Sequence, residues 1–238
     1  MSVTDQGSAI ELRNRGRVSF SEFRRGRRAK AGNRAVGGWI KRAMDVAVAI
    51  LILIGLAPLF LMVATALKVL SPGPVFYGHV RIGHGRRAFL CYKFRTMCVD
   101  GDAVLKRHLE ENPSAQIEWD IHRKLRDDPR VTRLGRVLRE TSVDELPQLL
   151  NVIRGDMSLV GPRPVVKDEL SLYGPSKHLY LSARPGITGP WQIGGRSTTE
   201  FADRVAMDSG YVTGWSVAKD IRILLKTVPA VVGARGAY

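Results

Sequence analysis

One stretch of the chain decides its fold: KRAMDVAVAILILIGLAPLFLMVATALK, residues 41–68. From Val46 to Leu67 it contains no charged side chain. About 20 apolar residues are enough for a helix to cross the hydrocarbon core of a bilayer. A helix that is apolar on every face has no polar side to turn to water, which argues against a surface helix of a soluble domain. The stretch therefore predicts a membrane segment.

The middle and the two ends of this segment predict that it enters the membrane and returns to the same side. Gly55 and Pro58 interrupt the apolar run, and a proline inside a helix removes a backbone hydrogen bond and kinks the axis. Asp45 lies at the entrance to the run. Basic residues flank it on both sides: Lys41, Arg42, Lys68, Arg81, Arg86 and Arg87. Because basic flanks stay in the cytoplasm, we favour a re-entrant helix–break–helix over the alternative of a simple span.

The whole chain is strongly basic, with 238 residues, a net charge of +15 and a pI near 10.4. Such a charge points to a polyanionic partner, for which nucleic acid, an anionic membrane surface and a phosphorylated substrate all qualify. Hydrophobic residues make up 45% of the chain, which is enough for a packed core and excludes wholesale disorder. Cys91 and Cys98 match no zinc or disulfide pattern, so a reducing compartment is the simplest interpretation.

These patterns divide the chain into three regions. Residues 1–38 carry nine lysine and arginine residues and no apolar core of a signal peptide. We expect a disordered basic tail there, either simply solvated or attracted to anionic lipids. Residues 39–70 are expected to form the re-entrant membrane helix, and residues 71–238 a cytosolic catalytic domain. The expected fold class is α+β and mostly helical.

The catalytic region contains recognisable local elements. Short strands are expected at Val75–Val80 and Phe89–Phe94, around a basic, glycine-rich loop. Helices are expected over residues 102–126 and Val143–Ile153. A last helix carries apolar residues at helical spacing within Trp215–Val228. It suits either an amphipathic helix lying in the membrane interface or a surface helix packed on the core, and the pattern alone does not separate the two.

The strongest candidates for catalysis are two adjacent carboxylates, Asp144 and Glu145, in the segment TSVDELPQLL at residues 141–150. At a helix start they would lie in the positive field of the helix dipole, which keeps a carboxylate ionised as a nucleophile requires. The free N–H groups of such a helix start can also hold a phosphate. Ser142 and Glu145 have the spacing of a capping box as well, so a purely structural interpretation stays open.

Several basic residues around the carboxylate pair are candidate phosphate ligands. Some of them are arginines flanked by glycine and proline, which suits a fixed loop that presents a guanidinium to phosphate oxygens. The candidates are Lys93, Arg95, Arg139, Arg163, Arg184 and Arg196. Any one of them is more often a solvated surface charge, but several in one small domain predict a polyphosphate site.

Other classes of protein find little support in the same residues. The sequence has no GxxxxGK[ST] loop and no GxGxxG after a strand, so neither nucleotide-binding motif is present. It has no HExxH motif and no cysteine–histidine cluster, which argues against a zinc site. It also lacks the patterns of RNA-recognition motifs, helix-turn-helix proteins and zinc fingers.

Taken together, the motifs resemble one known family, the monotopic phosphoglycosyl transferases or bacterial sugar transferases, from about Lys41 to the C-terminus. The segments that carry the resemblance are Lys41-Arg42-x-x-Asp45 with the proline-broken run, Ser71-Pro72-Gly73-Pro74-Val75-Phe76-Tyr77, Tyr92-Lys93-Phe94-Arg95-Thr96-Met97, Asp128-Pro129-Arg130-Val131-Thr132-Arg133-Leu134-Gly135, Asp144-Glu145-Leu146-Pro147-Gln148, Gly155-Asp156-Met157-Ser158-Leu159-Val160-Gly161-Pro162-Arg163-Pro164 and Arg184-Pro185-Gly186-Ile187-Thr188-Gly189. Each is unspecific alone, but their order is highly specific. In finer detail, the sequence is similar to the exopolysaccharide-initiating members of this family, which transfer galactose 1-phosphate.

The resemblance implies a magnesium-dependent, ping-pong transfer of a sugar phosphate at the inner membrane of a bacterium, with the catalytic domain facing the cytoplasm. Asp144 would be the nucleophile, Glu145 would hold Mg²⁺, and Arg139 would bind phosphate. The implied partners are a UDP-sugar, undecaprenyl phosphate and anionic membrane lipids, and no nucleic acid; a homodimer is left open. Galactose is favoured over glucose by resemblance alone.

Two interpretations from other classes are kept beside the transferase. One is a membrane-tethered protein that binds nucleic acid or regulates through its basic tail and loops. The other is a non-catalytic scaffold of the same family. The carboxylate pair discriminates the transferase from the nucleic-acid-binding alternative, because a polyanion-binding protein has no use for adjacent carboxylates inside its basic site. The segment from Gly194 to Tyr211 departs most from the family pattern, and we expect it to contribute to the choice of sugar.

Overall fold

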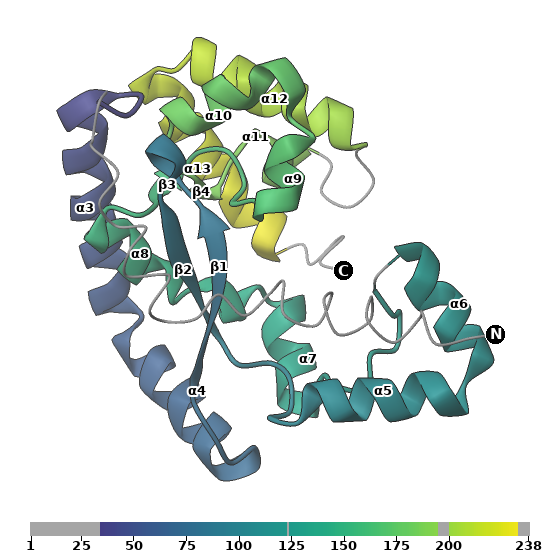
Figure 1. Cartoon of the computed structure of the whole chain (residues 1–238). Coiled ribbons are helices and arrows are strands. Elements are labelled where there is room, and N and C mark those ends of the chain that lie inside the picture. Colours follow the sequence, from purple (N-terminus) through teal and green to yellow (C-terminus); the bar gives the residue numbers. More distant parts are fainter. Residues whose placement is uncertain (1–33, 123, 195–199, 233–238) are drawn as a thin grey trace.

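The computed structural model describes residues 34–122, 124–194 and 200–232 (Figure 1). Most of the predicted basic tail and the predicted ligand Arg196 therefore lie outside the described residues. The described chain is mostly helical and contains two small sheets, which confirms the expected α+β class.

The predicted membrane segment forms two helices, α3 (Gly38–Gly55) and α4 (Ala57–Leu70), which run along one side of the molecule (Figure 1). Their axes are bent by 61° at Leu56. Pro58 lies in the first turn of α4, where its missing N–H would have had no intrahelical partner. Taken singly, no helix in the described part of the chain is long and apolar enough to cross a membrane, whereas the bent pair together meets that test.

Each of the two sheets has two strands. Strand β1 (Phe76–Ile82) pairs antiparallel with β2 (Ala88–Phe94), with Tyr77 opposite Lys93. The short turn η1 (His84–Arg86) joins them, which confirms the predicted hairpin with ends shifted by one or two residues. Strands β3 (Ser158–Val160) and β4 (Gly186–Thr188) pair in parallel.

The remaining elements are short helices that cover the sheets. They are α5 (Gly101–Glu111), α6 (Pro113–His122), α7 (Arg133–Glu140), η2 (Val143–Glu145), α8 (Gln148–Arg154), α9 (Lys167–Ser171), η3 (Gly174–Ser176), α10 (Lys177–Ser182), α11 (Pro190–Gly194), α12 (Phe201–Thr213) and α13 (Val217–Val232). Two helix predictions were wrong in detail. The helix expected over residues 102–126 is two helices, because Pro113 pushes Asn112 into an extended conformation. The helix expected from Val143 begins only at Gln148.

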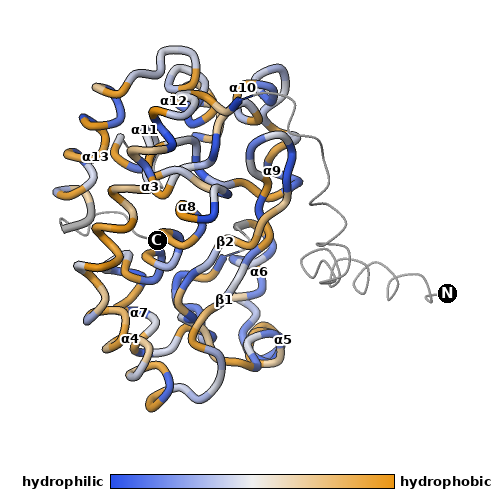
Figure 2. Tube along the Cα trace, turned by 90° about the vertical axis from the view of Figure 1, so that its left-hand side faces the viewer, coloured by the Kyte–Doolittle hydropathy of each residue, from blue (hydrophilic) through white to orange (hydrophobic). Residues whose placement is uncertain are grey.

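The main hydrophobic core lies where α3, α8, β2, β3, α12 and α13 meet, and a second cluster lies between α4 and α7. Helix α13 packs on the core through Ile223, which is buried, whereas Leu225 and Val228 are exposed. A position in the membrane interface stays a prediction for this helix. Figure 2 shows hydrophobic residues along α3, α4 and α13.

The start of α3 is fixed to the catalytic region by a buried polar cluster. The Lys41 ammonium lies 2.5 Å from Asp220 Oδ2 on α13 and 3.8 Å from Asp45 Oδ1. Asp45 also accepts hydrogen bonds from the Ser158 hydroxyl at 2.7 Å and from the Leu159 N–H at 3.1 Å. Asp45 is thus buried within the protein at the junction of α3 and β3, and it does not face outward from the apolar run.

Two further contacts secure the same junction. Asp220 accepts hydrogen bonds from the Tyr211 hydroxyl at 2.6 Å and from the Trp215 indole at 3.0 Å. Arg42 donates to the carbonyl oxygens of Val152 and Ile153, the latter at 2.8 Å, and so binds orphan carbonyls at the end of α8. Helix α3 is therefore joined to α8 and α13 by several buried or half-buried polar contacts.

Candidate active site

Asp144 and Glu145 lie side by side in η2, a single 3₁₀ turn between α7 and α8. Ser142, which precedes them, has a left-handed backbone (φ 57°, ψ 15°), and its side chain makes no capping hydrogen bond. The structural alternative of a capping box at Ser142 is therefore not realised. A non-glycine residue in this conformation is strained, and such strain is common at functional sites.

Lys93 connects the two carboxylates. Its ammonium lies 2.6 Å from Glu145 Oε1 and 3.6 Å from Asp144 Oδ2. It reaches them from β2, from the same face of the hairpin as its cross-strand partner Tyr77. The structure therefore brings the predicted ligand Lys93 directly to the carboxylate pair.

The electrostatic surroundings give the two carboxylates different tendencies to ionise. Burial raises the pKa of Asp144; the Lys93 ammonium opposes this rise and the charge of Glu145 adds to it. Burial also acts to raise the pKa of Glu145, but Lys93 and then Arg163 lower it below its usual value. Glu145 is thus the more firmly ionised partner, and Asp144 is an anion in an unfavourable, more reactive setting. The expectation that a helix dipole keeps Asp144 ionised was wrong, because α8 begins four residues later.

Arg139 lies beside this pair on α7. Its Nε donates to the Thr96 hydroxyl at 2.9 Å, and its charge favours ionisation of Asp144. Gly135 explains how α7 comes so close to Thr96. A Cβ at position 135 would lie 2.0 Å from the Thr96 carbonyl oxygen, so only glycine fits there. Arg139 is consequently held by a tight contact between α7 and the chain that follows β2.

Arg163 faces the pair from another direction. It follows β3, is half-buried, and its guanidinium carbon lies 4.9 Å from the centre of the Trp191 ring. Within the described residues it forms no ion pair and no hydrogen bond from its side chain. Its N–H donors are therefore free for a ligand next to Glu145, as the phosphate-binding prediction requires.

Two other predicted ligands have their donors directed to the backbone. Arg95 donates to the carbonyl oxygens of Ser71 and Pro72, the latter at 3.1 Å, and so fixes the end of α4. Gly73, with φ of 134°, leaves room for this guanidinium. Arg184 donates to the Gly155 carbonyl at 3.1 Å. Both arginines hold loops in place here, and phosphate binding by them stays a prediction.

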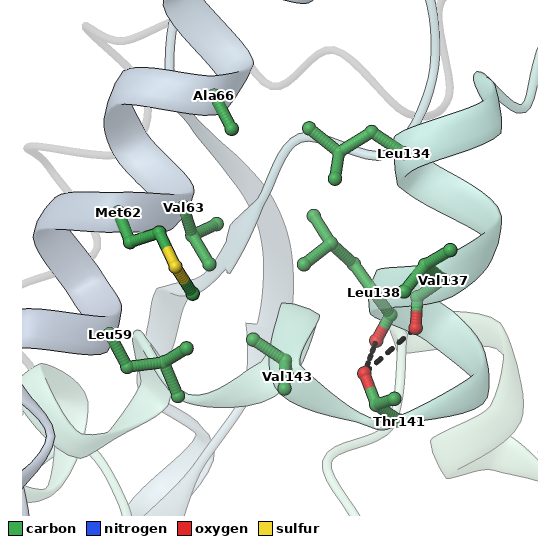
Figure 3. Close-up of a pocket in the computed structure, with 9 residues that line it drawn as sticks. All are labelled: Leu59, Met62, Val63, Ala66, Leu134, Val137, Leu138, Thr141 and Val143. Atoms are coloured by element: carbon green, nitrogen blue, oxygen red, sulfur yellow. Dashed lines mark hydrogen bonds between the residues drawn. The ribbon is translucent and has the colours of Figure 1, made fainter.

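An apolar groove borders the turn that carries the carboxylate pair. Its volume is about 370 Å³, and it lies between α4, α7 and the start of η2 (Figure 3). The lining residues are Leu59, Met62, Val63, Ala66, Leu134, Val137, Leu138, Thr141 and Val143. The one polar side chain among them, Thr141, donates its hydroxyl back to the carbonyls of Val137 and Leu138 (Figure 3). Val143 directly precedes Asp144, so the groove adjoins the turn that carries the candidate nucleophile.

The sequence matches the family model described as bacterial sugar transferase over residues 36–234. The chain belongs to the bacterial sugar transferase family. This finding confirms the family resemblance drawn from the motifs.

Among the relatives of this bacterial sugar transferase is the exopolysaccharide production protein ExoY of Sinorhizobium fredii (strain NBRC 101917 / NGR234), with 56% identity over 205 residues, 86% of this chain and 91% of the relative. The undecaprenyl-phosphate galactose phosphotransferase of Salmonella typhimurium is 48% identical over 84% of this chain but only 42% of its own length. The UDP-glucose:undecaprenyl-phosphate glucose-1-phosphate transferase of Caulobacter vibrioides is 42% identical over 83% of this chain and 72% of the relative.

A magnesium ion at the carboxylate pair of this sugar transferase stays a prediction, and the pair offers two carboxylates for it. Among the residues described, no three or more histidine, cysteine, aspartate or glutamate side chains gather into a site that would hold a metal alone. Mg²⁺ usually keeps several waters and needs only one or two carboxylates when substrate phosphates supply further ligands. Glu145, with its lowered pKa, is the carboxylate suited to this role.

Sequence reasoning missed several side chains near the site. His79 lies next to Lys93 on the same face of the hairpin, and its buried Nδ1 has no hydrogen-bond partner. Burial, with Arg81 and Lys93 nearby, lowers its pKa to about 4, so its ring is neutral at pH 7. Trp191 and Arg204 were also not recognised. The alternation of strand residues could have pointed to His79, but nothing local distinguishes Trp191 or Arg204 from packing residues.

Proposed function

We propose that this chain transfers a hexose 1-phosphate from a UDP-sugar to undecaprenyl phosphate, releases UMP, and so initiates exopolysaccharide synthesis. The observation that carries the proposal is the pair Asp144–Glu145, bridged by Lys93 and next to a turn residue, Val143, that lines an apolar groove. Such a site suits a reaction between a charged diphosphate and a phosphate carried by a hydrophobic lipid chain. The names of the relatives support the same pair of substrates.

The first half of the proposed reaction takes place on Asp144. A carboxylate oxygen of Asp144 forms a bond to the β-phosphorus of the UDP-sugar while the bond from that phosphorus to the bridging oxygen breaks. UMP leaves with the electron pair, and the sugar phosphate stays on Asp144. The raised pKa of Asp144 marks an anion that burial has destabilised, which favours attack.

The second half of the reaction releases the product. An oxygen of the lipid phosphate attacks the same phosphorus, the bond to Asp144 breaks, and the carboxylate is regenerated. The product is a sugar joined to the lipid through a diphosphate. No proton has to be abstracted in either half, because both nucleophiles are already anions, so the site needs positive charge more than an acid or a base.

Positive charge around the pair supports this chemistry. Lys93, Arg139 and Arg163 surround Asp144 and Glu145 and would bind the phosphate oxygens on which charge accumulates. Mg²⁺, held by Glu145 and by the donor phosphates, would add charge neutralisation when bound.

The groove between α4 and α7 would hold the first isoprenoid units of the acceptor. Its lining is apolar, and its open side belongs to helix α4, which also carries the exposed residues Leu61 and Met62. A lipid could therefore pass from the bilayer into the groove without leaving apolar surroundings. The phosphate at its end would meet Arg139 and Asp144.

The membrane arrangement is proposed on the same evidence of charge and shape. The 61° bend between α3 and α4 supports a re-entrant segment that leaves both flanks on the cytoplasmic side of the inner membrane. The buried contact of Lys41 with Asp220 supports it too, because it keeps the start of α3 beside the catalytic region. The basic tail, residues 1–38, would then face the anionic inner leaflet.

A direct assay tests the proposed function. Purified protein is mixed with undecaprenyl phosphate, Mg²⁺ and either UDP-galactose or UDP-glucose, and UMP release is measured. We expect UMP release with a higher kcat/KM for UDP-galactose, since a relative named for galactose is more similar to this chain than one named for glucose. Equal values or a glucose preference would remove the sugar assignment alone. If no sugar nucleotide releases UMP, the non-catalytic scaffold is the better description.

A further inference from the structure

The guanidinium of Arg163 is the least compensated charge near the carboxylate pair. Lys93 is paired with Glu145, and Arg139 donates to Thr96, but Arg163 has no side-chain partner among the described residues. Its charge nevertheless acts on Glu145 and on Lys93. An unpaired arginine in a half-buried position is costly unless a ligand completes it. Neighbouring side chains must therefore hold this guanidinium in place.

Trp191, on α11, supplies that support. The Arg163 guanidinium lies 4.9 Å from the centre of the indole ring, and the Arg204 guanidinium lies 5.2 Å from the same centre. Arg204 also reaches the Arg163 carbonyl oxygen from its Nη2 at 3.5 Å. The ring therefore carries two cations, which is unusual because each repels the other and both depend on the negative face of the indole.

The two cations on this ring differ in a way that separates their roles. Arg204 is 7% exposed and has a counter-charge in Asp208, at 3.9 Å on the same helix. Asp208 is in turn held by the Tyr173 hydroxyl at 2.8 Å. Arg204 is thus part of a buried ion pair with Asp208, whereas Arg163 is half-buried and its side chain forms no ion pair within the described residues, although its charge also acts on Asp208. Arg163 is therefore the more accessible of the two arginines to an anion from outside.

We infer that Trp191 is a positioning residue of the donor site, whose indole holds the Arg163 guanidinium where its free N–H groups bind the diphosphate of the nucleotide sugar. This inference rests on the proposed function. A guanidinium stacked on a ring keeps its in-plane N–H groups directed past the edge of the ring, which is the geometry that two phosphate oxygens need. The lipid acceptor, by contrast, would approach from the groove beside Val143, so Trp191 should not affect its binding.

The test separates donor binding from catalysis. Binding of UDP-galactose is measured by calorimetry in an Asp144→Asn background, in which no transfer occurs. Trp191→Leu should weaken binding roughly tenfold, since a desolvated cation–π contact is worth about 1–2 kcal/mol. Trp191→Phe should recover most of the loss, because it keeps an aromatic face. In the active enzyme, Trp191→Leu should raise KM for the UDP-sugar and leave KM for undecaprenyl phosphate unchanged.

A matched control and a double-mutant cycle exclude a general loss of structure. Trp119→Leu removes a similar stack, with Arg130 at 5.3 Å, outside the donor site and should leave UDP-galactose binding unchanged. In an Arg163→Lys background, where the planar group is already lost, Trp191→Leu should have little further effect. The inference would be overturned if Trp191→Leu lowered the affinity for UDP-galactose equally with Arg163 present and with Arg163 replaced by lysine, or did not lower it at all. The proposed function would stand in either case. If Asp144→Asn binds no UDP-sugar, the proposed function fails first, and the inference with it.

Discussion

Lys93 forms a 2.6 Å ion pair with Glu145, and its ammonium lies only 1 Å further from Asp144, at 3.6 Å. One ammonium therefore contacts two carboxylates whose pKa values are shifted in opposite directions. Burial raises the pKa of Asp144, whereas Lys93 and Arg163 together lower that of Glu145. The pair is thereby divided into a stable anion and a reactive one. Adjacent acids of similar intrinsic pKa become distinct only through such an asymmetric partner.

Replacing the reactive carboxylate should stop the reaction. Asp144→Asn has nearly the same shape but cannot form the phosphosugar bond, so UMP release should fall by about 10,000-fold or more. The measurement is UMP release from UDP-galactose, with a thermal denaturation curve to verify folding. Glu145→Gln is the matched comparison and should also fail, with a changed dependence on Mg²⁺. Turnover near the wild-type rate in Asp144→Asn would remove the nucleophile assignment.

The pH dependence of the reaction should respond to Lys93. Asp144 must be ionised to attack, so activity falls as the pH drops through the pKa of this carboxylate. Lys93 opposes the rise in that pKa that burial causes. Lys93→Met should therefore move the acidic limb of the kcat/KM profile to higher pH and lower the rate at neutral pH on the order of 100-fold.

The control for this profile is a lysine outside the site. Lys106→Met removes an exposed lysine of α5, which pairs only with Glu110 among the described residues, and should leave the acidic limb in place. An unchanged limb in Lys93→Met would show that Asp144 is not the group that titrates.

A polar side chain in the groove should impair the lipid acceptor alone. Met62→Gln places an amide in the apolar lining and should raise KM for undecaprenyl phosphate several-fold, with little change in KM for the UDP-sugar. Leu61→Gln is the matched control, because it makes a similar change on the preceding residue of α4, which is exposed and outside the groove. If both variants behave alike, the effect belongs to membrane contact in general and the groove is not the acceptor site.

Cysteine labelling in intact cells tests the re-entrant arrangement. Single cysteines replace Lys30 and Glu110, in a chain whose Cys98 has been changed to serine; Cys91 is buried. Both new cysteines should be protected from a membrane-impermeant reagent and should react after lysis, because the proposed arrangement leaves both flanks of the segment in the cytoplasm. Reaction of residue 30 in intact cells would establish a span instead.

The sequence was sufficient for those features that depend on local pattern. The break at Gly55 and Pro58, the β1–β2 hairpin and the carboxylate pair all lie where the pattern predicts them. Each depends on residues close together in the chain, such as a proline in a first turn or alternating strand residues.

What the sequence did not reveal depends on distant contacts. Arg95, Arg163 and Arg184 were all predicted phosphate ligands, yet among these three only the Arg163 side chain forms no hydrogen bond within the described residues. The difference arises because Arg95 meets the end of α4 and Arg184 meets the Gly155 carbonyl. Likewise the ionisation of Asp144 is set by burial and by Lys93, a residue of another element, and not by the helix start that the local pattern suggested.

The contact between Lys41 and Asp220 also has a consequence for the synthesis of the protein, because 179 positions separate the two residues. A ribosome that adds about 5–20 residues per second needs roughly 10–40 seconds after Lys41 before it makes its counter-ion. Throughout that time the ammonium at the start of α3 lacks its closest partner. Closure of the enzyme around α3 is therefore a late event of translation. In the proposed membrane arrangement, a nascent chain stopped short of Asp220 would hold α3 in the bilayer without the counter-ion of Lys41.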